Sequence, residues 1–287
     1  MSRTALAALF ALLAFAANSI LCRMALRQAH IDPASFTSVR LLAGALTMWI
    51  LVLLNRPRRS LGGDWGSALA LLAYAVAFSF AYVAVTAGTG ALLLFGAVQL
   101  VMISVGLLSG ERMNRGIAIG WALAVVGLVI LVIPGVSAAP LLQASFMLCA
   151  GVAWAIYSLR GRRSANPLRD TAGNFVRAAP AALLISAILW SRSSCDSEGF
   201  WLAALSGSIA SGLGYAAWYV ALPRLSAITA ANLQLSVPVI AGLGGVALFA
   251  EPISARLIGS TILVLGGIAL ATHQSIRMVA RAGSANS

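Results

Sequence analysis

Aromatic and small polar residues recur at helical spacing in several apolar stretches of this sequence. Tyr74, Phe78 and Tyr82 repeat every four residues, which places their side chains on one face of a helix. Aromatic rings can hold an apolar group, while hydroxyl and amide groups orient polar groups, so such faces are typical of small-molecule sites. Three further sets of residues share a helical face in the same way. The first is Ser208, Ser211, Tyr215 and Trp218. The second is Gly151, Trp154 and Ser158, with Tyr157 close by, and the third is Phe15, Asn18 or Ser19, and Cys22.

Uncharged amides interrupt otherwise apolar stretches at Asn18, Gln99, Asn232 and Gln234. An amide that faced lipid would leave its hydrogen-bonding groups unsatisfied, at a cost of a few kcal/mol, ~4 for a typical group. We therefore expect these amides to face the interior of a helix bundle or a wet cavity. The alternative is that they join helices to one another, as serine and amide side chains often do.

Two arginines, Arg40 and Arg177, occupy similar places in the two halves of the chain. Each lies about two turns inside an apolar stretch, roughly 10 Å from its end at ~1.5 Å per residue. Such a cation could attract a carboxylate or form part of a gate. Alternatively, its long side chain could reach back to the nearest interface.

The acidic residues fall outside the apolar stretches. Glu111 and Glu251 end corresponding stretches of the two halves, and we expect them to pair with Arg112, Arg115 or Arg256. A carboxylate inside a span is the usual proton carrier of a membrane pump, so its absence predicts transport down the substrate gradient or only weak coupling to protons. The sequence offers no nucleophile–base pair, which argues against an enzyme.

The composition indicates a membrane protein. Of the 287 residues, 61% are hydrophobic and 9% are charged, whereas a soluble domain has about 25% charged residues. The net charge is +12, but all 19 basic residues are arginines in short clusters, which argues against a nucleic-acid partner. The cysteines, Cys22, Cys149 and Cys195, have no metal-ligand spacing, and we expect neither a metal nor another cofactor.

Ten apolar stretches are long enough to cross a bilayer, and the pattern of the first five recurs in the second five. We expect an all-α membrane protein with ten transmembrane helices in two five-helix repeats, residues 1–136 and residues 137–287 with a short C-terminal tail. The expected spans are 4–29, 34–54, 65–86, 90–109, 116–133, 141–159, 171–190, 200–222, 226–250 and 257–274.

The arginines predict the orientation of these spans. Most lie between spans on the side that holds both termini, which by the positive-inside rule is the cytoplasm. An odd number of spans per repeat inverts the second repeat, a geometry that lets a central site open to either side in turn. We expect a multi-pass protein of a bacterial-type inner membrane, with both termini cytoplasmic.

Several motifs resemble the drug/metabolite transporter superfamily, and within it the EamA-type ten-helix exporters. They are Trp154-Ala155-Ile156-Tyr157, the Glu111 and Glu251 ends, the duplicated halves and the Gly-rich fifth and tenth spans. Tyr215-Ala216-Ala217-Trp218 is similar to the aromatic amino-acid exporters of this superfamily. One departure is Phe15, where family members often carry Trp. The resemblance implies export of amino acids or related metabolites.

We therefore expect an exporter of amino acids, including aromatic and large apolar ones, that works by alternating access as a monomer in the lipid bilayer, with a dimer as the alternative. A drug carrier, a carrier of nucleotide sugars or other phosphorylated metabolites, and a lipid-flipping or scaffolding subunit are the other readings. Phosphorylated substrates need several convergent cations, which counts against them. The residues expected to bind substrate are Trp154, Tyr82, Trp218, Tyr215, Tyr157, Gln99, Asn18, Ser19, Phe78, Ser211, Gln234 and Arg40.

Overall fold

The computed structural model describes residues 3–55, 61–108, 114–133, 139–162, 164–221, 224–225 and 233–284. Within these ranges the elements are helices, and a single bridge joins Ile31 to Cys195. The prediction of an all-α membrane protein is confirmed. In chain order the helices are α1 (Arg3–Arg27), α2 (Pro33–Asn55), α3 (Trp65–Tyr82), α4 (Ala87–Leu108), α5 (Arg115–Val132), α6 (Leu141–Gly161), α7 (Pro167–Ile188), η1 (Trp190–Arg192), α8 (Ser197–Leu205), η2 (Ser206–Leu213), α9 (Gly214–Ala221), α11 (Ser236–Phe249) and α12 (Ala255–Ser284).

Side-chain caps fix where several helices begin. Asp64 accepts a hydrogen bond from the Ser67 amide at the start of α3, and Asp196 accepts one from the Gly199 amide at the start of α8. Asn166 caps α7, whose first residue is Pro167. These acceptors satisfy amides that have no partner in the first helical turn. The cap at Asn166 starts α7 four residues before the expected boundary.

The expected spans are present in the described part of the chain with shifted ends. Nine helices there are long and apolar enough to cross a membrane, with α8, η2 and α9 forming one of them as the continuous segment Ser197–Ala221. The ninth expected span is represented by α11, of 14 residues, and residues 226–232 of that span lie outside the described ranges. The last helix, α12, continues ten residues beyond the expected boundary.

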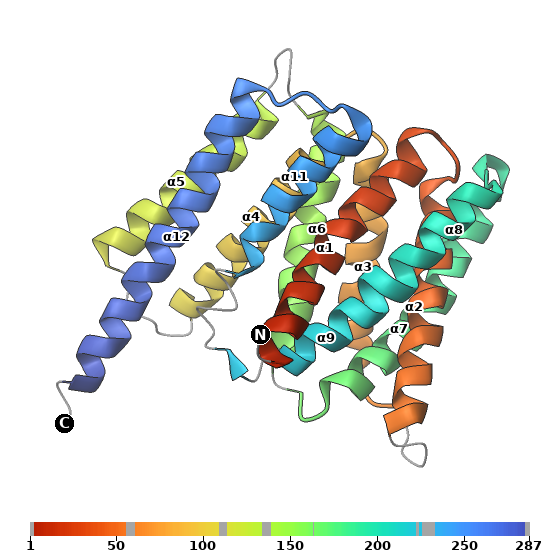
Figure 1. The fold of residues 1–287 in the computed structure, drawn as a ribbon, viewed down its shortest axis with the longest axis horizontal. Helices are drawn as coiled ribbons and strands as arrows, with labels where there is room; N and C mark the ends of the chain where they lie inside the picture. Colours follow the sequence, from red (N-terminus) through yellow and green to blue (C-terminus); the bar gives the residue numbers. More distant parts are fainter. Residues whose placement is uncertain are drawn as a thin grey trace.

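Helices of the first half pack mainly against helices of the second half. The principal neighbours are α5 with α12, α4 with α11, α2 with α7, α3 with α6, and α1 with α9. Figure 1 shows α5 and α12 as a pair at one edge of the bundle, and it shows the start of α1 and the end of α12 toward the same end. The core of the protein is therefore the boundary between its two halves.

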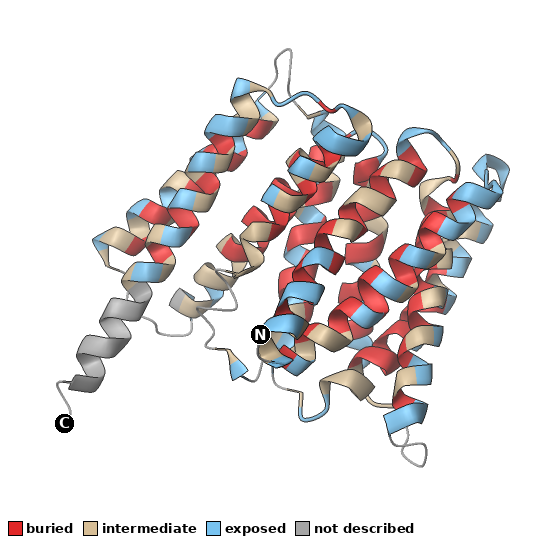
Figure 2. Cartoon of the chain, in the orientation of Figure 1, coloured by how far each residue is buried: buried red, intermediate tan, exposed pale blue. Residues whose placement is uncertain are grey.

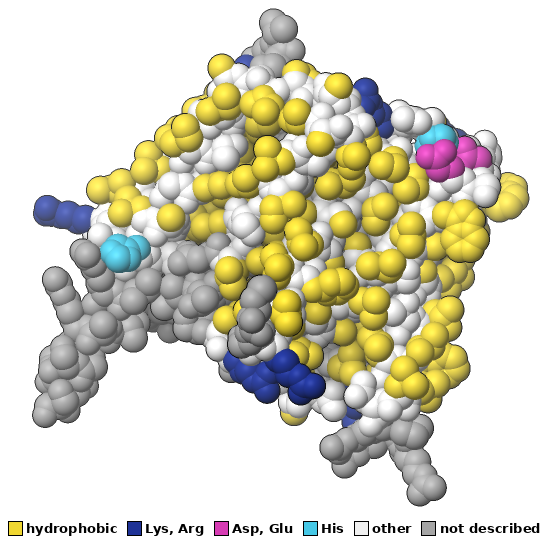
Figure 3. Space-filling view, in the orientation of Figure 1, with side chains coloured by type: hydrophobic (Ala, Val, Ile, Leu, Met, Phe, Trp, Pro, Cys, Tyr) yellow, Lys and Arg dark blue, Asp and Glu magenta, His cyan; other side chains and the backbone are white. Residues whose placement is uncertain are grey.

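The outer surface of the bundle is apolar. Large hydrophobic side chains such as Leu46, Leu184 and Ile262 are more than half exposed, although buried residues fill the faces between helices (Figure 2). Figure 3 shows hydrophobic side chains across the middle of one face, with charged side chains gathered toward its edges. Such a surface matches a lipid bilayer.

Different residues lie at the two ends of the bundle. The Asp64 end holds the start of α3 and the ends of α6 and α9, whereas the Glu251 end holds the connections from α3 to α4 and from α11 to α12. The 18 residues of α3 join these two ends, a distance of about 27 Å at ~1.5 Å per residue.

One close approach between helices explains two of the glycines. A Cβ on Gly120 would lie 2.4 Å from the Gly267 carbonyl oxygen, so these residues let α5 and α12 touch. By contrast, a Cβ on Gly259 or Gly266 would meet no atom within 4 Å. Close packing between these two helices therefore depends on Gly120 and Gly267 and does not involve Gly259 or Gly266.

Candidate functional site

An aromatic cluster lies in the core, where α1, α3, α6 and α9 meet. Its centre is Trp154 of α6, whose ring centroid lies 4.9 Å from that of Tyr74, 5.0 Å from Tyr215 and 5.5 Å from Tyr157. Phe15 of α1 packs edge-on against Trp154, Tyr215 and Trp218 at centroid distances of 6.4, 5.9 and 5.9 Å. The position at which family members often carry Trp thus still supplies an aromatic ring to the cluster.

The cluster continues along α3 toward the Glu251 end. Tyr74, Phe78 and Tyr82 lie one turn apart, with centroid distances of 5.4 Å and then 4.7 Å. All three rings are buried, as the four-residue spacing predicts. The structure therefore brings together six of the residues expected to bind substrate: Trp154, Tyr157, Tyr215, Trp218, Phe78 and Tyr82.

Arg40 of α2 places a cation against these rings. Its side chain is among the most buried in the protein, at 1% exposure, so it does not extend to an interface. The guanidinium carbon lies 5.1 Å from the Tyr74 ring centroid and 4.9 Å from that of Phe78, within the range of cation–π attraction. Nε donates to Ser211 Oγ at 3.3 Å, and Nη2 donates to the Tyr74 hydroxyl at 3.1 Å.

The third guanidinium nitrogen of Arg40, Nη1, is buried and has no hydrogen-bond partner. The ion pairs of the described residues also leave Arg40 without a carboxylate. The Tyr215 hydroxyl, from the same cluster, is likewise buried, and its polar neighbour is Tyr74. Because an unpaired buried donor is costly, these two groups form an incomplete polar site that an anionic group could complete.

Asn18 connects this site to a second polar chain. Its Nδ2 donates to the Tyr74 hydroxyl at 3.2 Å, and its Oδ1 accepts from Ser206 Oγ at 2.6 Å. The Tyr74 hydroxyl therefore accepts from both Arg40 and Asn18. Of the two adjacent candidates in α1, Asn18 joins the polar network directly, and Ser19 is buried beside it with 2% exposure.

The segment η2 is a π-helix, and this changes which serines face the site. A π-helix has hydrogen bonds between residues five apart, so such residues lie close to one face, and π-helical turns are frequent at functional sites. Ser206 and Ser211 are five apart and reach Asn18 and Arg40, respectively. Ser208 instead donates to the Ala204 carbonyl and is half-buried, so its expected place in the stripe is wrong.

Glycine allows η2 to approach Arg40. A Cβ on Gly207 would lie 2.2 Å from the carbonyl oxygen of Arg40, closer than a side chain permits. Sequence periodicity could not reveal Ser206, because a spacing of five does not match an α-helix. Tyr74 lies in its stripe, yet its hydroxyl is the centre of a polar network that spacing alone does not indicate.

Two other expected residues, Gln99 and Gln234, are not joined to the Arg40 site by hydrogen bonds within the described part of the chain. Gln99 of α4 is buried with its Nε2 unpartnered, and Gln234 is half-buried before α11. The described hydrogen bonds connect neither one to Arg40 or to the cluster. Asn232 falls outside the described residues.

Arg177 does not correspond to Arg40 in its contacts. Its Nη1 donates to the Gly62 carbonyl at 2.7 Å, at the Asp64 end of the bundle. Near it, a polar pocket of about 200 Å³ is lined by residues of both halves, including Asp64, Tyr157 and Asp170. The hydrogen bond from the Ser67 hydroxyl lowers the pKa of Asp64 to about 2, so Asp64 is ionised when it pairs with Arg160 at 2.6 Å.

Glu251 pairs with a residue that its sequence position does not suggest. Its Oε1 accepts from Nε of Arg23, in α1, at 3.0 Å, so the expected pairing with Arg112, Arg115 or Arg256 is wrong for Glu251. Arg256 donates instead to the Ile133 carbonyl. Glu111 lies outside the described residues. Because Arg23 and Glu251 belong to opposite ends of the sequence, no local pattern could predict this pair.

Comparison with known proteins identifies the family. The sequence model of the EamA-like transporter family matches residues 141–272. An uncharacterized protein of Pseudomonas aeruginosa is 50% identical over 283 residues, covering 98% of this chain and 99% of the relative. A crystal structure of a protein with 20% sequence identity shares the fold, with a TM-score of 0.69 over 96% of this chain and 99% of that chain. This multi-pass membrane protein belongs to the EamA-like transporter family, in the drug/metabolite transporter superfamily.

Proposed function

We propose that this transporter exports amino acids, including aromatic and large apolar ones, and that Arg40 binds their carboxylate. The observation that carries the proposal is the buried, unpartnered Nη1 of Arg40 beside aromatic rings. A substrate carboxylate would accept a charge-assisted hydrogen bond from Nη1 and a second hydrogen bond from the Tyr215 hydroxyl. The rings of Trp154, Trp218 and Phe15 would then surround the substrate side chain.

The other substrate classes fit this site less well. A phosphate group carries more charge than one guanidinium can balance, and Arg177 is committed to the Gly62 carbonyl at the Asp64 end. A cationic drug would meet the like charge of Arg40 in a low-dielectric environment, which is unfavourable. For a lipid-flipping or scaffolding subunit, a buried cation surrounded by rings would have no evident use.

We also propose that the halves are inverted repeats, residues 1–136 and 137–287, that alternate around this site. The helix pairing supports this proposal. In the repeats, α6 corresponds to α1, and the α8–α9 segment corresponds to α3. Exchanging the halves therefore turns the α3–α6 pair into the pair of α1 with the α8–α9 segment, and both pairs pack closely. The α2–α7, α4–α11 and α5–α12 pairs exchange into themselves, as expected for a two-fold relationship. In this arrangement the rings of the aromatic cluster separate whenever substrate enters.

The arginines support an orientation with the Asp64 end in the cytoplasm of a bacterial-type cell. Arg3, Arg115, Arg160, Arg162 and Arg169 lie at or near that end. Positive charge is retained on the cytoplasmic side of membrane proteins. The start of α1 and the end of α12 lie toward that end, so both termini would be cytoplasmic in an inner-membrane exporter.

The test is transport of phenylalanine by purified protein in liposomes. We expect Arg40→Gln to reduce counterflow of phenylalanine at subsaturating concentration by at least about tenfold at equal folded yield, because a charge-assisted contact is lost. Arg177→Gln is the control, since its guanidinium lies away from the cluster.

A competition experiment identifies the group that Arg40 recognises. In the wild type, added phenylalanine should inhibit the counterflow of labelled phenylalanine. Phenylalanine amide, which lacks a carboxylate, should inhibit it poorly. Normal phenylalanine counterflow by Arg40→Gln would contradict the proposal. Stronger competition by sugar phosphates or by cationic dyes would contradict it as well.

A further inference from the structure

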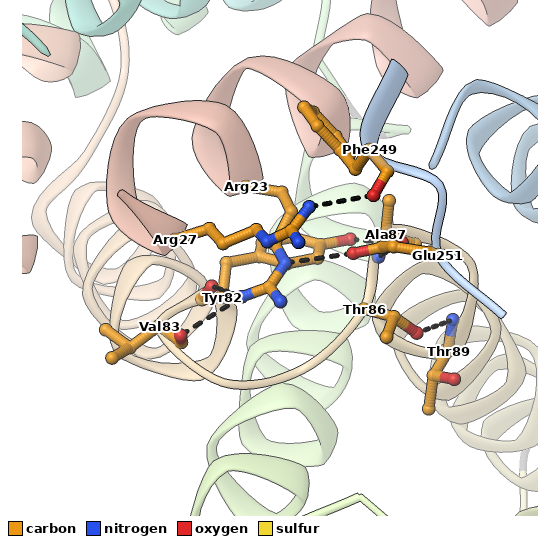
Figure 4. Close-up of polar contacts among 9 residues, drawn as sticks. All are labelled: Arg23, Arg27, Tyr82, Val83, Thr86, Ala87, Thr89, Phe249 and Glu251. Carbon is orange, nitrogen blue, oxygen red and sulfur yellow. Dashed lines mark hydrogen bonds and ion pairs between the residues drawn. The ribbon is translucent and has the colours of Figure 1, made fainter. Parts of the chain in front are cut away.

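At the Glu251 end, Arg23 and Glu251 form a buried ion pair between the two halves of the chain. Their side chains are 10% and 8% exposed, and Nε of Arg23 lies 3.0 Å from Oε1 of Glu251. Nη1 of Arg23 donates to the carbonyls of Tyr82 and Val83, each at 3.0 Å. Oε2 of Glu251 accepts from the Ala87 amide at 2.9 Å. Figure 4 shows the pair enclosed by α1, the α3–α4 connection and the chain after α11.

The backbone around Glu251 is shaped to deliver its carboxylate to Arg23. Ala250 ends α11 in the left-handed conformation, with φ of 51°, and turns the chain back toward α1. Arg27, one turn after Arg23, donates to the Phe249 carbonyl at 3.0 Å and holds the same segment. The pair is therefore one part of a clasp that joins α1 to the end of α11.

A continuous row of contacts connects Arg23 to the proposed carboxylate site at Arg40. The Arg40 guanidinium packs on the Phe78 ring, the Phe78 ring packs edge-on against Tyr82, and the Tyr82 carbonyl accepts from Arg23. Two buried cations thus lie along α3 with two rings between them. Arg40 has a vacant donor, and Arg23 is occupied by the carboxylate of Glu251.

Glu251 also has space to leave Arg23. It lines a pocket of about 220 Å³ at the Glu251 end, together with Thr86, Pro252 and Leu257. The rest of that pocket is formed mainly by apolar side chains of α4, α11 and α12. This pocket adjoins the carboxylate and gives the Glu251 side chain room to turn away from Arg23 when another carboxylate takes its place.

We propose that Arg23 is a second carboxylate-binding residue of the transport path and that Glu251 occupies it in place of substrate. A substrate carboxylate that leaves Arg40 toward the Glu251 end displaces Glu251 from Arg23, and release of substrate lets Glu251 return. The inference rests on the proposed function, since it requires a substrate that carries a carboxylate.

The exchange explains how a buried ion pair can open at all. Removing Glu251 alone would leave the Arg23 charge buried and uncompensated, which is strongly unfavourable. An incoming carboxylate restores the pairing and so lowers the barrier to opening. The Glu251 end then opens mainly when substrate is present, and it stays closed when the site is empty.

Three variants distinguish a substrate-binding role of Arg23 from a purely structural role of the ion pair. Arg23→Gln and Glu251→Gln break the same ion pair, so a purely structural role predicts similar losses of transport. Under the proposal, Arg23→Gln lowers phenylalanine counterflow at least about tenfold, whereas Glu251→Gln frees Arg23 for substrate and lowers it little. Arg192→Gln, at an exposed arginine of the same end, is the control for surface charge.

The double variant Arg23→Gln/Glu251→Gln keeps the test valid if a single variant folds poorly. It leaves no unpaired charge, and two amides can still hydrogen-bond across the clasp. The proposal predicts a loss of transport as large as in Arg23→Gln. Wild-type transport by the double variant, or equal losses in the two single variants, would overturn the proposal.

Cys22 provides a readout that does not depend on transport. It precedes Arg23 in α1 and is completely buried, whereas Cys149 and Cys195 are exposed and can be replaced by serine. In that background, we expect Glu251→Gln to increase labelling of Cys22 by a membrane-impermeant maleimide several-fold. Phenylalanine should increase labelling of the background protein, and phenylalanine amide should not. Asp64→Asn, which breaks the ion pair at the opposite end, is the control variant and should leave Cys22 protected.

The two proposals fail in different ways. Loss of phenylalanine transport in Arg40→Gln together with normal transport in Arg23→Gln/Glu251→Gln would overturn the exchange and leave the proposed function standing. Normal transport in Arg40→Gln would instead contradict the proposed function. Cys22 labelling that is unchanged by both Glu251→Gln and phenylalanine would overturn the opening of this end.

Discussion

Gly245 lies directly behind the carboxylate of Glu251. A Cβ on Gly245 would be 2.4 Å from Oε2 of Glu251, so the space beside this residue is the space that the carboxylate occupies. Gly245 is one turn before the end of α11, and Glu251 follows the left-handed turn at Ala250. The absence of a side chain at position 245 therefore sets the position from which Glu251 reaches Arg23.

Replacing Gly245 by alanine should displace Glu251 without changing any charge. We expect Gly245→Ala to increase maleimide labelling of Cys22 and to destabilise the protein by about 1–3 kcal/mol, the typical effect of overpacking. The measurements are labelling in the background that lacks Cys149 and Cys195, and thermal unfolding in detergent. Gly259→Ala is the matched control, because a Cβ there meets no atom within 4 Å. Full protection of Cys22 in Gly245→Ala would contradict this reading.

A methyl group on Gly207 should disturb the polar network around Arg40. Because its Cβ would lie 2.2 Å from the Arg40 carbonyl oxygen, Gly207→Ala should push η2 away from α2 and lengthen the bond from Arg40 to Ser211. We expect a several-fold higher KM for phenylalanine transport. The control is Gly266→Ala, whose Cβ has open space. An unchanged KM would show that the position of η2 does not affect binding.

Truncating the central ring of the aromatic cluster should impair transport beyond its effect on folding. Trp154→Ala removes a ring that packs on Tyr74, Tyr157 and Tyr215, and large-to-small core changes of this kind cost about 3–5 kcal/mol. We expect a loss of phenylalanine counterflow per folded molecule, with partial recovery in Trp154→Phe.

The control for the ring truncation is a tryptophan on the outer surface. Trp201 is 62% exposed, so Trp201→Ala should leave counterflow near the wild-type rate. Folded protein is quantified by size-exclusion chromatography before each assay. Equal transport by the Trp154→Ala and Trp201→Ala variants would exclude Trp154 from the substrate path.

His30 should make stability depend on pH at the Glu251 end. It lies between α1 and α2 and contacts Asp196 at 2.7 Å and Glu198 at 3.7 Å. The hydrogen bond to Asp196 raises the pKa of His30 above its ordinary value of 6.5. The stabilisation is therefore fully present below pH 6.5 and is lost as the pH rises through the higher pKa of the folded state.

The check is the unfolding temperature of wild type and His30→Gln from about pH 5.5 to pH 9, the range in which histidine titrates. The wild type should be more stable at low pH, and the difference should shrink as the pH rises. Asp196 does not titrate in this range, because the backbone hydrogen bond from Gly199 lowers its pKa. His273→Gln, in α12, is the control. A difference that does not vary with pH would rule out a contribution from the charge of His30.

Periodicity predicted what lies on one helix, and it failed where two distant segments meet. Tyr74, Phe78 and Tyr82 share a buried face because a four-residue spacing nearly matches the helical turn. Ser206 could not be predicted, because η2 is a π-helix and its residues do not follow the α-helical repeat. The Arg23–Glu251 pair depends on tertiary packing of α1 against the end of α11, which the composition of neither segment encodes.

The burial of Arg40 also could not be read from depth alone. Its position two turns inside α2 allows either extension to the interface or a buried site. The difference depends on Tyr74 and Phe78, which provide a surface for the guanidinium, and on Ser211, which accepts a hydrogen bond. Arg177, in α7, instead donates a hydrogen bond to a backbone carbonyl, that of Gly62.

Charged pairs between the halves lie at both ends of α3, Asp64–Arg160 at one end and Arg23–Glu251 at the other. The packed rings between them separate the water at one membrane face from the water at the other. This separation keeps the membrane electrically insulated. Moving one charge across a membrane potential changes its free energy by about 2.3 kcal/mol for every 100 mV, which drives protons through any open water column. A carrier that opened both ends together would discharge this potential, whereas one that keeps one end closed moves its cargo and leaves the voltage of the membrane intact.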